Sequence, residues 1–240
     1  MATHTPLLIL WDIDHTLVSI KGVSRDIYAR AFEQVTGRQM EHLADMTGRT
    51  EKAIITETLA LNGVEPDSSF EAFYIALGEA ARSLEPAMRD HGAALPGAGE
   101  AITMFAAEGY VQSVVTGNIR NIAVTKLEAF GLHEHIDFEV GGYGDDGSDR
   151  AELVRLAISR TNAKYDHGFK AEQAVVIGDT PHDIRGALDN GALAVGVATG
   201  TSDLNELTAA GAEIVLPSLQ AIEELRETIR ARRADRATEA

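Results

Sequence analysis

Short apolar runs recur along this chain, and segments with helical periodicity separate them. The runs are apolar at nearly every position, which is typical of parallel strands that are covered on both faces. We predict strands over Leu7–Trp11, Tyr110–Val115, Phe138–Gly141, Ala174–Ile177, Ala194–Val197 and Ile214–Leu216. We predict helices between them, among others over Glu100–Glu108, Ile122–Phe130, Ala151–Thr161 and Ile184–Asn190. This alternation predicts an α/β fold with a doubly wound, Rossmann-like parallel sheet.

One long segment interrupts the alternation. From about residue 20 to residue 92 the apolar residues recur at helical spacing, and no strand pattern is convincing. The chain then passes through Ala93–Gly97, a stretch rich in turn-forming residues, before the next helix of the alternating pattern. We therefore predict a discontinuous α/β core formed by residues 1–19 and 93–240, with an inserted α-helical domain formed by residues 20–92.

Composition narrows the classes of function. The 240 residues carry a formal net charge of −16. Nucleic-acid binders hold phosphate backbones with clustered Lys and Arg, so we expect no nucleic-acid partner. The chain lacks a run of 18 apolar residues, and its first apolar stretch lacks the basic leader of a signal peptide, so we expect no membrane partner. It also lacks cysteine, which fits a cytoplasmic protein. We expect a monomer or a weak homodimer.

Two aspartates follow the first predicted strand. Asp12 ends the strand and Asp14 lies two residues later, so both side chains approach the crevice in which α/β folds bind ligands. An ionised Asp12 could attack phosphorus, and Asp14 could act as general acid and then as general base. Coupling between two such carboxylates would push one pKa upward. Taken by itself, the pair could equally cap a turn.

Polar residues also follow two later strands. Thr116, Gly117 and Asn118 precede a predicted helix, where a hydroxyl and free backbone N–H groups suit a phosphate, although helix capping explains them as well. Asp179 and Asp183 follow the strand Ala174–Ile177. Together with Asp12 they could supply hard oxygen ligands for Mg²⁺.

In this order, the three motifs resemble those of the haloacid dehalogenase (HAD) superfamily, specifically its phosphatases with a helical cap. The resemblance implies that Asp12 forms an aspartyl-phosphate, and that Asp14 is the acid that separates phosphatases from true dehalogenases. It also implies that Thr116 binds a phosphoryl oxygen. Metal contact is implied for Asp12, the backbone carbonyl of Asp14 and Asp179. Asp183 would act through a water molecule or by contacting the residues that bind the metal.

The resemblance also calls for a cation that offsets the phosphoryl charge. Arg150 lies at the expected place, shortly before the helix that precedes the last acidic motif, and it is the first choice. Lys126 is the rival, although most helical lysines face water. The segment Thr47–Thr50 is similar to the substrate loop of the cap, and Arg49 within it could meet an anionic part of a substrate or lie on the surface.

The favoured hypothesis is a Mg²⁺-dependent hydrolase of a small phosphorylated metabolite. Phosphoglycolate phosphatase-like enzymes are the most similar, but Ser19-Ile20 stands where those enzymes often carry Asp-Ser or Asp-Thr. One alternative is a phosphomutase of the β-phosphoglucomutase kind. Another is a non-catalytic sensor of a phosphorylated ligand, which the retention of all four acids disfavours: Asp12, Asp14, Asp179 and Asp183.

Overall fold

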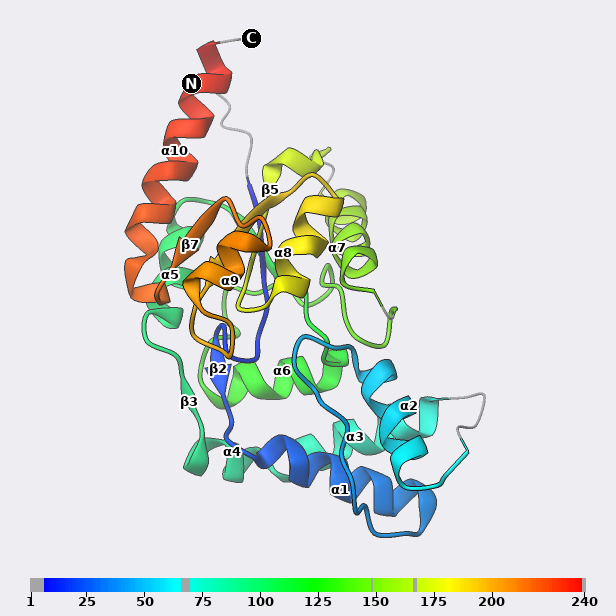
Figure 1. Cartoon of the computed structure of the whole chain (residues 1–240). Helices are drawn as coiled ribbons and strands as arrows, with labels where there is room; N and C mark the ends of the chain where they lie inside the picture. Colours follow the sequence, from blue (N-terminus) through cyan, green and yellow to red (C-terminus); the bar gives the residue numbers. More distant parts are fainter. Residues whose placement is uncertain (1–6, 66–69, 148, 166–167, 239–240) are drawn as a thin grey trace.

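The computed structural model describes residues 7–65, 70–147, 149–165 and 168–238, with side chains as far as residue 231. A five-stranded parallel sheet lies at its centre, in the order β4-β1-β5-β6-β7 (Figure 1). Its strands are β1 (Leu8–Trp11), β4 (Val111–Val114), β5 (Ala174–Gly178), β6 (Leu193–Val197) and β7 (Ile214–Leu216). The chain leaves β1 toward β4 and then returns past β1 to β5. Because ligands bind where an α/β sheet reverses its winding, this topology directs the site to the carboxyl end of β1.

The predicted strand over Phe138–Gly141 is wrong; the other five are confirmed. These four residues lie in turns and irregular backbone, and only Gly142 makes an isolated parallel bridge, to Val115. Gly142 packs so closely on the next helix that an added Cβ would lie 2.2 Å from the carbonyl oxygen of Leu153. The end of this segment therefore packs between the end of β4 and that helix without adding a strand to the sheet.

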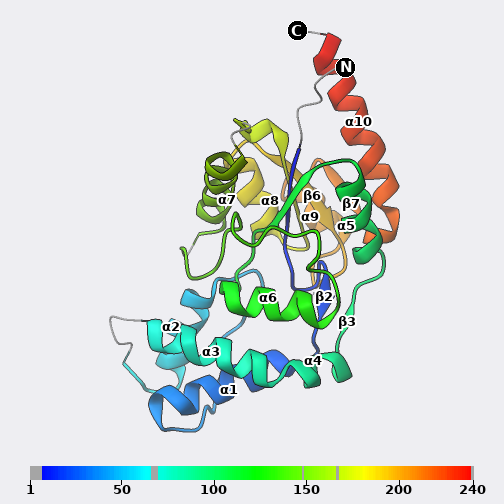
Figure 2. The same ribbon diagram turned by 180° about the vertical axis from the view of Figure 1, so that it is seen from behind.

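Helices cover both faces of the sheet, as Figures 1 and 2 show from opposite sides. They are α5 (Ala98–Ala107), α6 (Arg120–Ala129), α7 (Arg150–Tyr165), α8 (Pro181–Asp189), α9 (Leu204–Ala209) and α10 (Ile222–Thr238), with short 3₁₀ turns at Ala171–Gln173 and Leu219–Ala221. Ile9 and Trp11 of β1 pack with residues of α5, α6 and α10, whereas Leu8 and Leu10 pack with residues of α7, α8 and α9. Successive strand residues thus enter opposite layers, which explains why the run is apolar throughout.

Four helices follow the first strand motif: α1 (Val23–Thr36), α2 (Glu51–Leu61), α3 (Glu71–Ser83) and α4 (Glu85–His91). Between residues 20 and 92 the described part of the chain contains no strand, as predicted. These helices share an apolar cluster that includes Ile27, Ile55 and Leu77. Helix α6 lies between this layer and the sheet (Figures 1 and 2), contributing Leu127 to the core cluster and Ile122 to the other.

Two very short strands join the inserted helices to the sheet domain. These are β2 (Val18–Ser19) and β3 (Ala93–Ala94), which pair in antiparallel fashion with Ser19 opposite Ala93. We propose that this ribbon is the hinge between a core of residues 1–19 and 93–240 and a cap of residues 20–92. Among the residues described, no helix is long and apolar enough to cross a membrane.

Candidate active site

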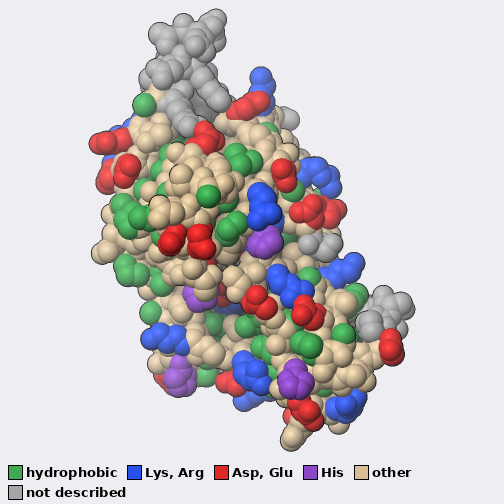
Figure 3. Space-filling model, viewed as in Figure 1, with side chains coloured by type: hydrophobic (Ala, Val, Ile, Leu, Met, Phe, Trp, Pro, Cys, Tyr) green, Lys and Arg blue, Asp and Glu red, His purple; other side chains and the backbone are tan. Residues whose placement is uncertain are grey.

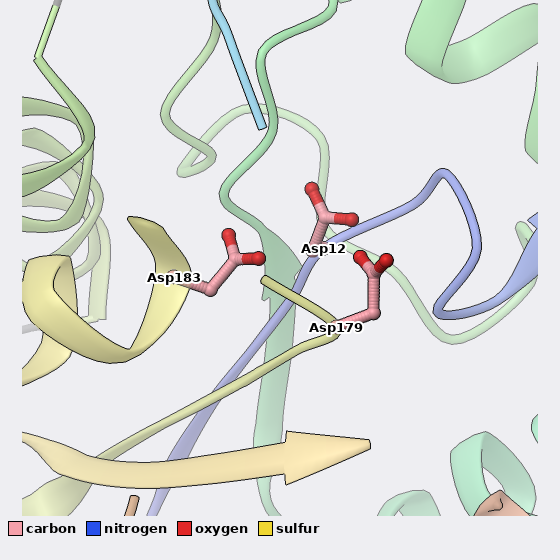
Figure 4. Close-up of side chains that lie close together, drawn as sticks. All are labelled: Asp12, Asp179 and Asp183. Carbon is pink, nitrogen blue, oxygen red and sulfur yellow. The ribbon is translucent and has the colours of Figure 1, made fainter. Parts of the chain in front are cut away.

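Three carboxylates converge at the carboxyl edge of the sheet. Asp12 follows β1, Asp179 follows β5, and Asp183 lies in the first turn of α8; Figure 4 shows the three side chains pointing toward one another. One oxygen from each lies within 4.8 Å of the others, and all three residues are buried. The hydroxyl of Thr16 lies 3.4 Å from an oxygen of Asp12 and 3.4 Å from one of Asp179. Parallel neighbouring strands end together, so the predicted trio forms one acidic centre.

Helix capping fixes the third acid of this centre. Thr180 is the N-cap of α8, and its hydroxyl accepts a hydrogen bond from the backbone N–H of Asp183. In return, Asp183 Oδ2 accepts from the backbone N–H of Thr180 at 3.1 Å and from its hydroxyl at 2.7 Å. Oδ2 therefore caps the helix, and Oδ1 makes no hydrogen bond.

Arg150 places a buried cation against the acids. Its Nη1 lies 3.3 Å from Asp12 Oδ1 and donates to the backbone carbonyl of Val115 at 3.0 Å. Its Nε lies 3.2 Å from Asp183 Oδ1, but the angle is too poor for a hydrogen bond, and both atoms are buried without a hydrogen-bond partner. Asp183 Oδ1 therefore makes an ion pair with Arg150 but no hydrogen bond, which leaves it able to bind a cation.

The electrostatics of this centre favour a divalent cation. Burial raises the pKa of Asp12, and the charges of Asp183 and Asp179 raise it further, against the opposing effect of Arg150. Burial and Asp183 also raise the pKa of Asp179 to about 8. Three buried carboxylates face one guanidinium, so a hard cation would relieve their mutual repulsion and use the free oxygen of Asp183.

Asp14 lies on the other side of the crevice, in contact with Lys126 and Asn118. Lys126 Nζ lies 2.7 Å from both carboxylate oxygens of Asp14 and 2.9 Å from Asn118 Oδ1. The amide of Asn118 donates to Asp14 at 2.6 Å and to the hydroxyl of Thr116 at 2.9 Å. Lys126, the rival candidate for the site cation, does not face water as most helical lysines do: it is only 3% exposed, because these two partners satisfy its charge inside the site.

These contacts decide how the acids share protons. Burial by itself would raise the pKa of Asp14, but the charge of Lys126 and hydrogen bonds from Lys126 and Asn118 lower it overall. The pKa of Asp12 is therefore the one that is raised, mainly by burial and by the charge of Asp183, and Asp14 adds only the smallest contribution. Asp14 gains a proton more readily once Lys126 engages another anion.

The loop that leads into α2 closes over the site from the side of the inserted helices. At Gly117, an added Cβ would lie 1.9 Å from the carbonyl oxygen of Arg49, and the carbonyl of Gly117 accepts from the N–H of Glu51 at 2.9 Å. Gly48 has a φ of 65°, and a Cβ there would lie 2.7 Å from His182. The absence of a side chain lets the loop meet the core backbone to backbone at Gly117 and leaves room for the side chain of His182 at Gly48.

A cavity of about 170 Å³ lies between the inserted helices and the carboxyl edge of the sheet. All ten predicted site residues line it: Asp12, Asp14, Arg49, Thr116, Gly117, Asn118, Lys126, Arg150, Asp179 and Asp183. The guanidinium of Arg49, however, is turned to the carboxylate of Glu57 and donates to the carbonyl of Asp45 at 3.1 Å. Sequence reasoning missed Tyr28 and Glu51, which also line the cavity. The only available signal was an acid at the start of the helix that follows the substrate-like loop.

Comparison with known proteins identifies the family. A model of haloacid dehalogenase-like hydrolases matches residues 9–197. The chain belongs to this family. A curated relative, the probable phosphatase IndB of Dickeya dadantii (strain 3937), is 28% identical over 132 residues. That match covers 55% of this chain and 55% of IndB, about half the length of each.

Solved structures agree with the HAD fold. A hydrolase from Pseudomonas syringae is 22% identical, with a TM-score of 0.66 over 93% of this chain and 99% of that one. CbbY from Rhodobacter sphaeroides, solved in complex with phosphate, is 19% identical, with a TM-score of 0.69 over 90% of this chain and 96% of its own. At these identities the likeness concerns the fold of the HAD chain and not its substrate.

A methyl group at Gly117 should push the two halves of the HAD chain apart. The Cβ of Gly117→Ala would meet the carbonyl of Arg49, so the hydrogen bond from Glu51 should be lost, and unfolding free energy should fall by about 1–3 kcal/mol. Hydrogen exchange should show faster amide exchange at the start of α2. Gly99→Ala is the control, because its Cβ would make only an ordinary 3.7 Å contact with Leu132. Unchanged exchange in Gly117→Ala would show that this contact does not hold the halves together.

Proposed function

We propose that this HAD-like hydrolase is a Mg²⁺-dependent phosphomonoesterase that acts on a small phosphorylated metabolite through an aspartyl-phosphate at Asp12. The observation that carries the proposal is the convergence of Asp12, Asp179 and Asp183 around Arg150, beside the cavity that Asp14 also lines. The name of the relative IndB, a probable phosphatase, and the phosphate bound to CbbY are consistent with it.

The side chains divide the reaction into two steps. An ionised oxygen of Asp12 attacks phosphorus and displaces the ester oxygen, which leaves with a proton from Asp14. Water then attacks the phosphoryl group of Asp12 and gives a proton to Asp14, so that phosphate departs and both carboxyl groups are regenerated. Mg²⁺, held by Asp12, Asp179, Asp183 and the carbonyl of Asp14, would offset charge on the phosphoryl oxygens.

Two cations of the chain would assist these steps. Arg150 is our first candidate for offsetting the phosphoryl charge, because it already contacts Asp12. Lys126 is the second: an entering phosphoryl group would compete with Asp14 for its ammonium group, which frees Asp14 to take up a proton. Thr116 and the N–H groups near Gly117 and Asn118 would bind the remaining oxygens.

Release of inorganic phosphate from a panel of small phosphomonoesters, with Mg²⁺ and with EDTA, tests the proposal. Metal-dependent release is the expected result. Isomerisation of a sugar phosphate that needs a sugar bisphosphate and releases no net phosphate would replace the proposal with the phosphomutase. Metal-dependent binding with neither product would replace it with the sensor. The cytoplasmic location and the monomeric or weakly dimeric state stay predictions.

Mg²⁺ should stabilise the metal-free protein, and more strongly at high pH. An acid whose pKa rises on folding weakens the fold as pH climbs above its ordinary pKa, so Asp179 should destabilise the protein progressively between pH 3.8, its ordinary pKa, and about pH 8. At one hundred times its Kd, Mg²⁺ adds about 2.7 kcal/mol, or roughly 5–11 °C in Tm. Differential scanning calorimetry at pH 5 and pH 8 measures the shift.

Two variants test whether the pH dependence and the Mg²⁺ shift in Tm come from Asp179. Asp179→Asn should flatten the loss of stability with pH and reduce the Mg²⁺ shift. The exposed Asp189 lies at the end of α8, so Asp189→Asn should behave like the wild type. A Tm that Mg²⁺ leaves unchanged at pH 8 would contradict a metal site at these acids.

A further inference from the structure

The side of the cavity formed by the inserted helices offers a substrate a carboxyl group and no unengaged cation among the described residues that line it. Among the described residues that line the cavity from this side, the charged ones are Arg49 and Glu51. Arg49 points elsewhere: besides Glu57, its guanidinium contacts the backbone carbonyls of Asp45 and Ala53 at 3.1 and 3.4 Å. A substrate therefore meets a carboxyl group on this side, with the one guanidinium already engaged.

Glu51 is held in place by contacts with α1 and with the core. It is the first residue of α2 and only 4% exposed. Its carboxylate accepts a hydrogen bond from the hydroxyl of Tyr28 on α1, and its N–H donates to the carbonyl of Gly117 in the core at 2.9 Å. Tyr28 is itself buried at 6% exposure and lines the same cavity. A buried carboxyl group is costly unless it is partnered, and a cavity-lining one can gain a partner from a ligand.

The protonation of Glu51 suits a neutral partner. Burial raises the pKa of Glu51 to about 8; Lys126 lowers it, whereas Asp14 and Asp145 raise it. Near neutral pH the carboxyl group therefore carries a proton much of the time and can both donate and accept, as can the hydroxyl of Tyr28. A hydroxyl group of a ligand matches both, whereas a carboxylate can only accept, would compete with Glu51 for the proton of the Tyr28 hydroxyl, and would add a negative charge near Asp14 and Asp145.

We propose that Glu51 and Tyr28 determine the specificity of the hydrolase: they bind a hydroxyl group on the leaving group of a short polyol phosphate and reject a carboxylate at the same position. The inference rests on the proposed function, since it assigns the phosphoryl group to the core side of the cavity. A volume of about 170 Å³ suits a small ester, because drug-sized ligands need roughly 300–1,000 Å³. The substrate class then differs from the carboxylate-bearing phosphoglycolate that the sequence resemblance suggested.

Four two-carbon phosphomonoesters test the inference because they differ only at the distal group. These are 2-hydroxyethyl phosphate, phosphoglycolate, phosphoethanolamine and ethyl phosphate. For the wild type with Mg²⁺, kcat/KM should be highest for 2-hydroxyethyl phosphate and lowest for phosphoglycolate. Glu51→Gln should raise kcat/KM for phosphoglycolate by about tenfold, and Tyr28→Phe should lower the preference for hydroxyethyl over ethyl by about tenfold. In both variants the readout is the ratio of kcat/KM between two esters, in which a change common to all esters cancels.

Glu33→Gln is the matched control, because it removes the same charge from an exposed position of α1. A wild type that prefers phosphoglycolate would overturn the inference, as would ratios that Glu51→Gln and Tyr28→Phe leave unchanged. A preference for phosphoethanolamine that Glu51→Gln abolishes would replace the hydroxyl with an ammonium group as the recognised feature.

Measurements of ligand binding distinguish a failure of this inference from a failure of the proposed function. Kd values of the four esters, measured by isothermal titration calorimetry on Asp12→Asn with Mg²⁺, report selectivity without turnover. If the wild type hydrolyses none of the esters but the binding ratios follow the expected order and respond to Glu51→Gln, the hydrolase proposal fails and the selectivity stands. If the esters are hydrolysed but their Kd values are the same, the selectivity inference fails and the hydrolase proposal stands.

Discussion

Asp12→Asn should lower phosphate release by roughly three to six orders of magnitude, because the neutral amide cannot attack phosphorus. The change is nearly isosteric, so the hydrogen bond from Thr16 and the packing around β1 should persist. Rates from phosphate assays and intact-mass spectra measure the effect: the wild type quenched in acid should carry one extra phosphoryl group, and Asp12→Asn should carry none.

Asp189→Asn is the control for Asp12→Asn, since it makes the same chemical change at an exposed position. The stability of Asp12→Asn adds a second readout. Because burial and neighbouring acids raise the pKa of Asp12, its charge opposes folding, so Asp12→Asn should have a higher Tm than the metal-free wild type at pH 8. Turnover close to wild type in a folded Asp12→Asn would remove Asp12 from the role of nucleophile.

Asp14→Asn should reduce hydrolysis of alkyl phosphates by roughly 10²–10⁴-fold, because an alkoxide leaves poorly without a proton donor. The loss in the first step should be smaller for p-nitrophenyl phosphate, whose phenolate leaves without a proton. Phosphorylated Asp12 should then accumulate, because the second step still lacks its general base. Rates across alkyl and aryl esters, with intact mass at early times, measure both effects.

Lys126→Met provides the matched comparison for Asp14→Asn. It removes the charge that lowers the pKa of Asp14 and leaves the carboxyl group in place. Its loss of rate should therefore vary little with the leaving group, whereas that of Asp14→Asn should vary strongly. An equal loss for alkyl and aryl esters in Asp14→Asn, without accumulation of phosphorylated Asp12, would show that Asp14 positions other groups and transfers no proton.

Much of the fold follows from local sequence patterns. Ile9 and Leu10 enter opposite apolar layers, so the pattern of β1 has one solution, a strand buried on both faces. Three helices end two residues before a glycine with positive φ, as expected at helix ends. These glycines are Gly109 after α5, Gly131 after α6 and Gly191 after α8, with φ values of 75°, 69° and 71°. The pattern misled at Phe138–Gly141, where Phe138 packs on the apolar cluster shared by β1, α5 and α6 and the four residues form no strand.

By itself, the sequence determined the order of strands and helices, the helical character of the insert, and the acids that follow β1 and β5. Each depends on neighbours within a few positions, which periodicity and turn chemistry report directly. Only the tertiary structure decided that Lys126 is buried against Asp14, 112 positions away, and that Arg49 turns to Glu57 while Glu51 meets the cavity. The burial of a charge depends on partners that the fold brings from distant segments, and no local pattern records where those partners lie.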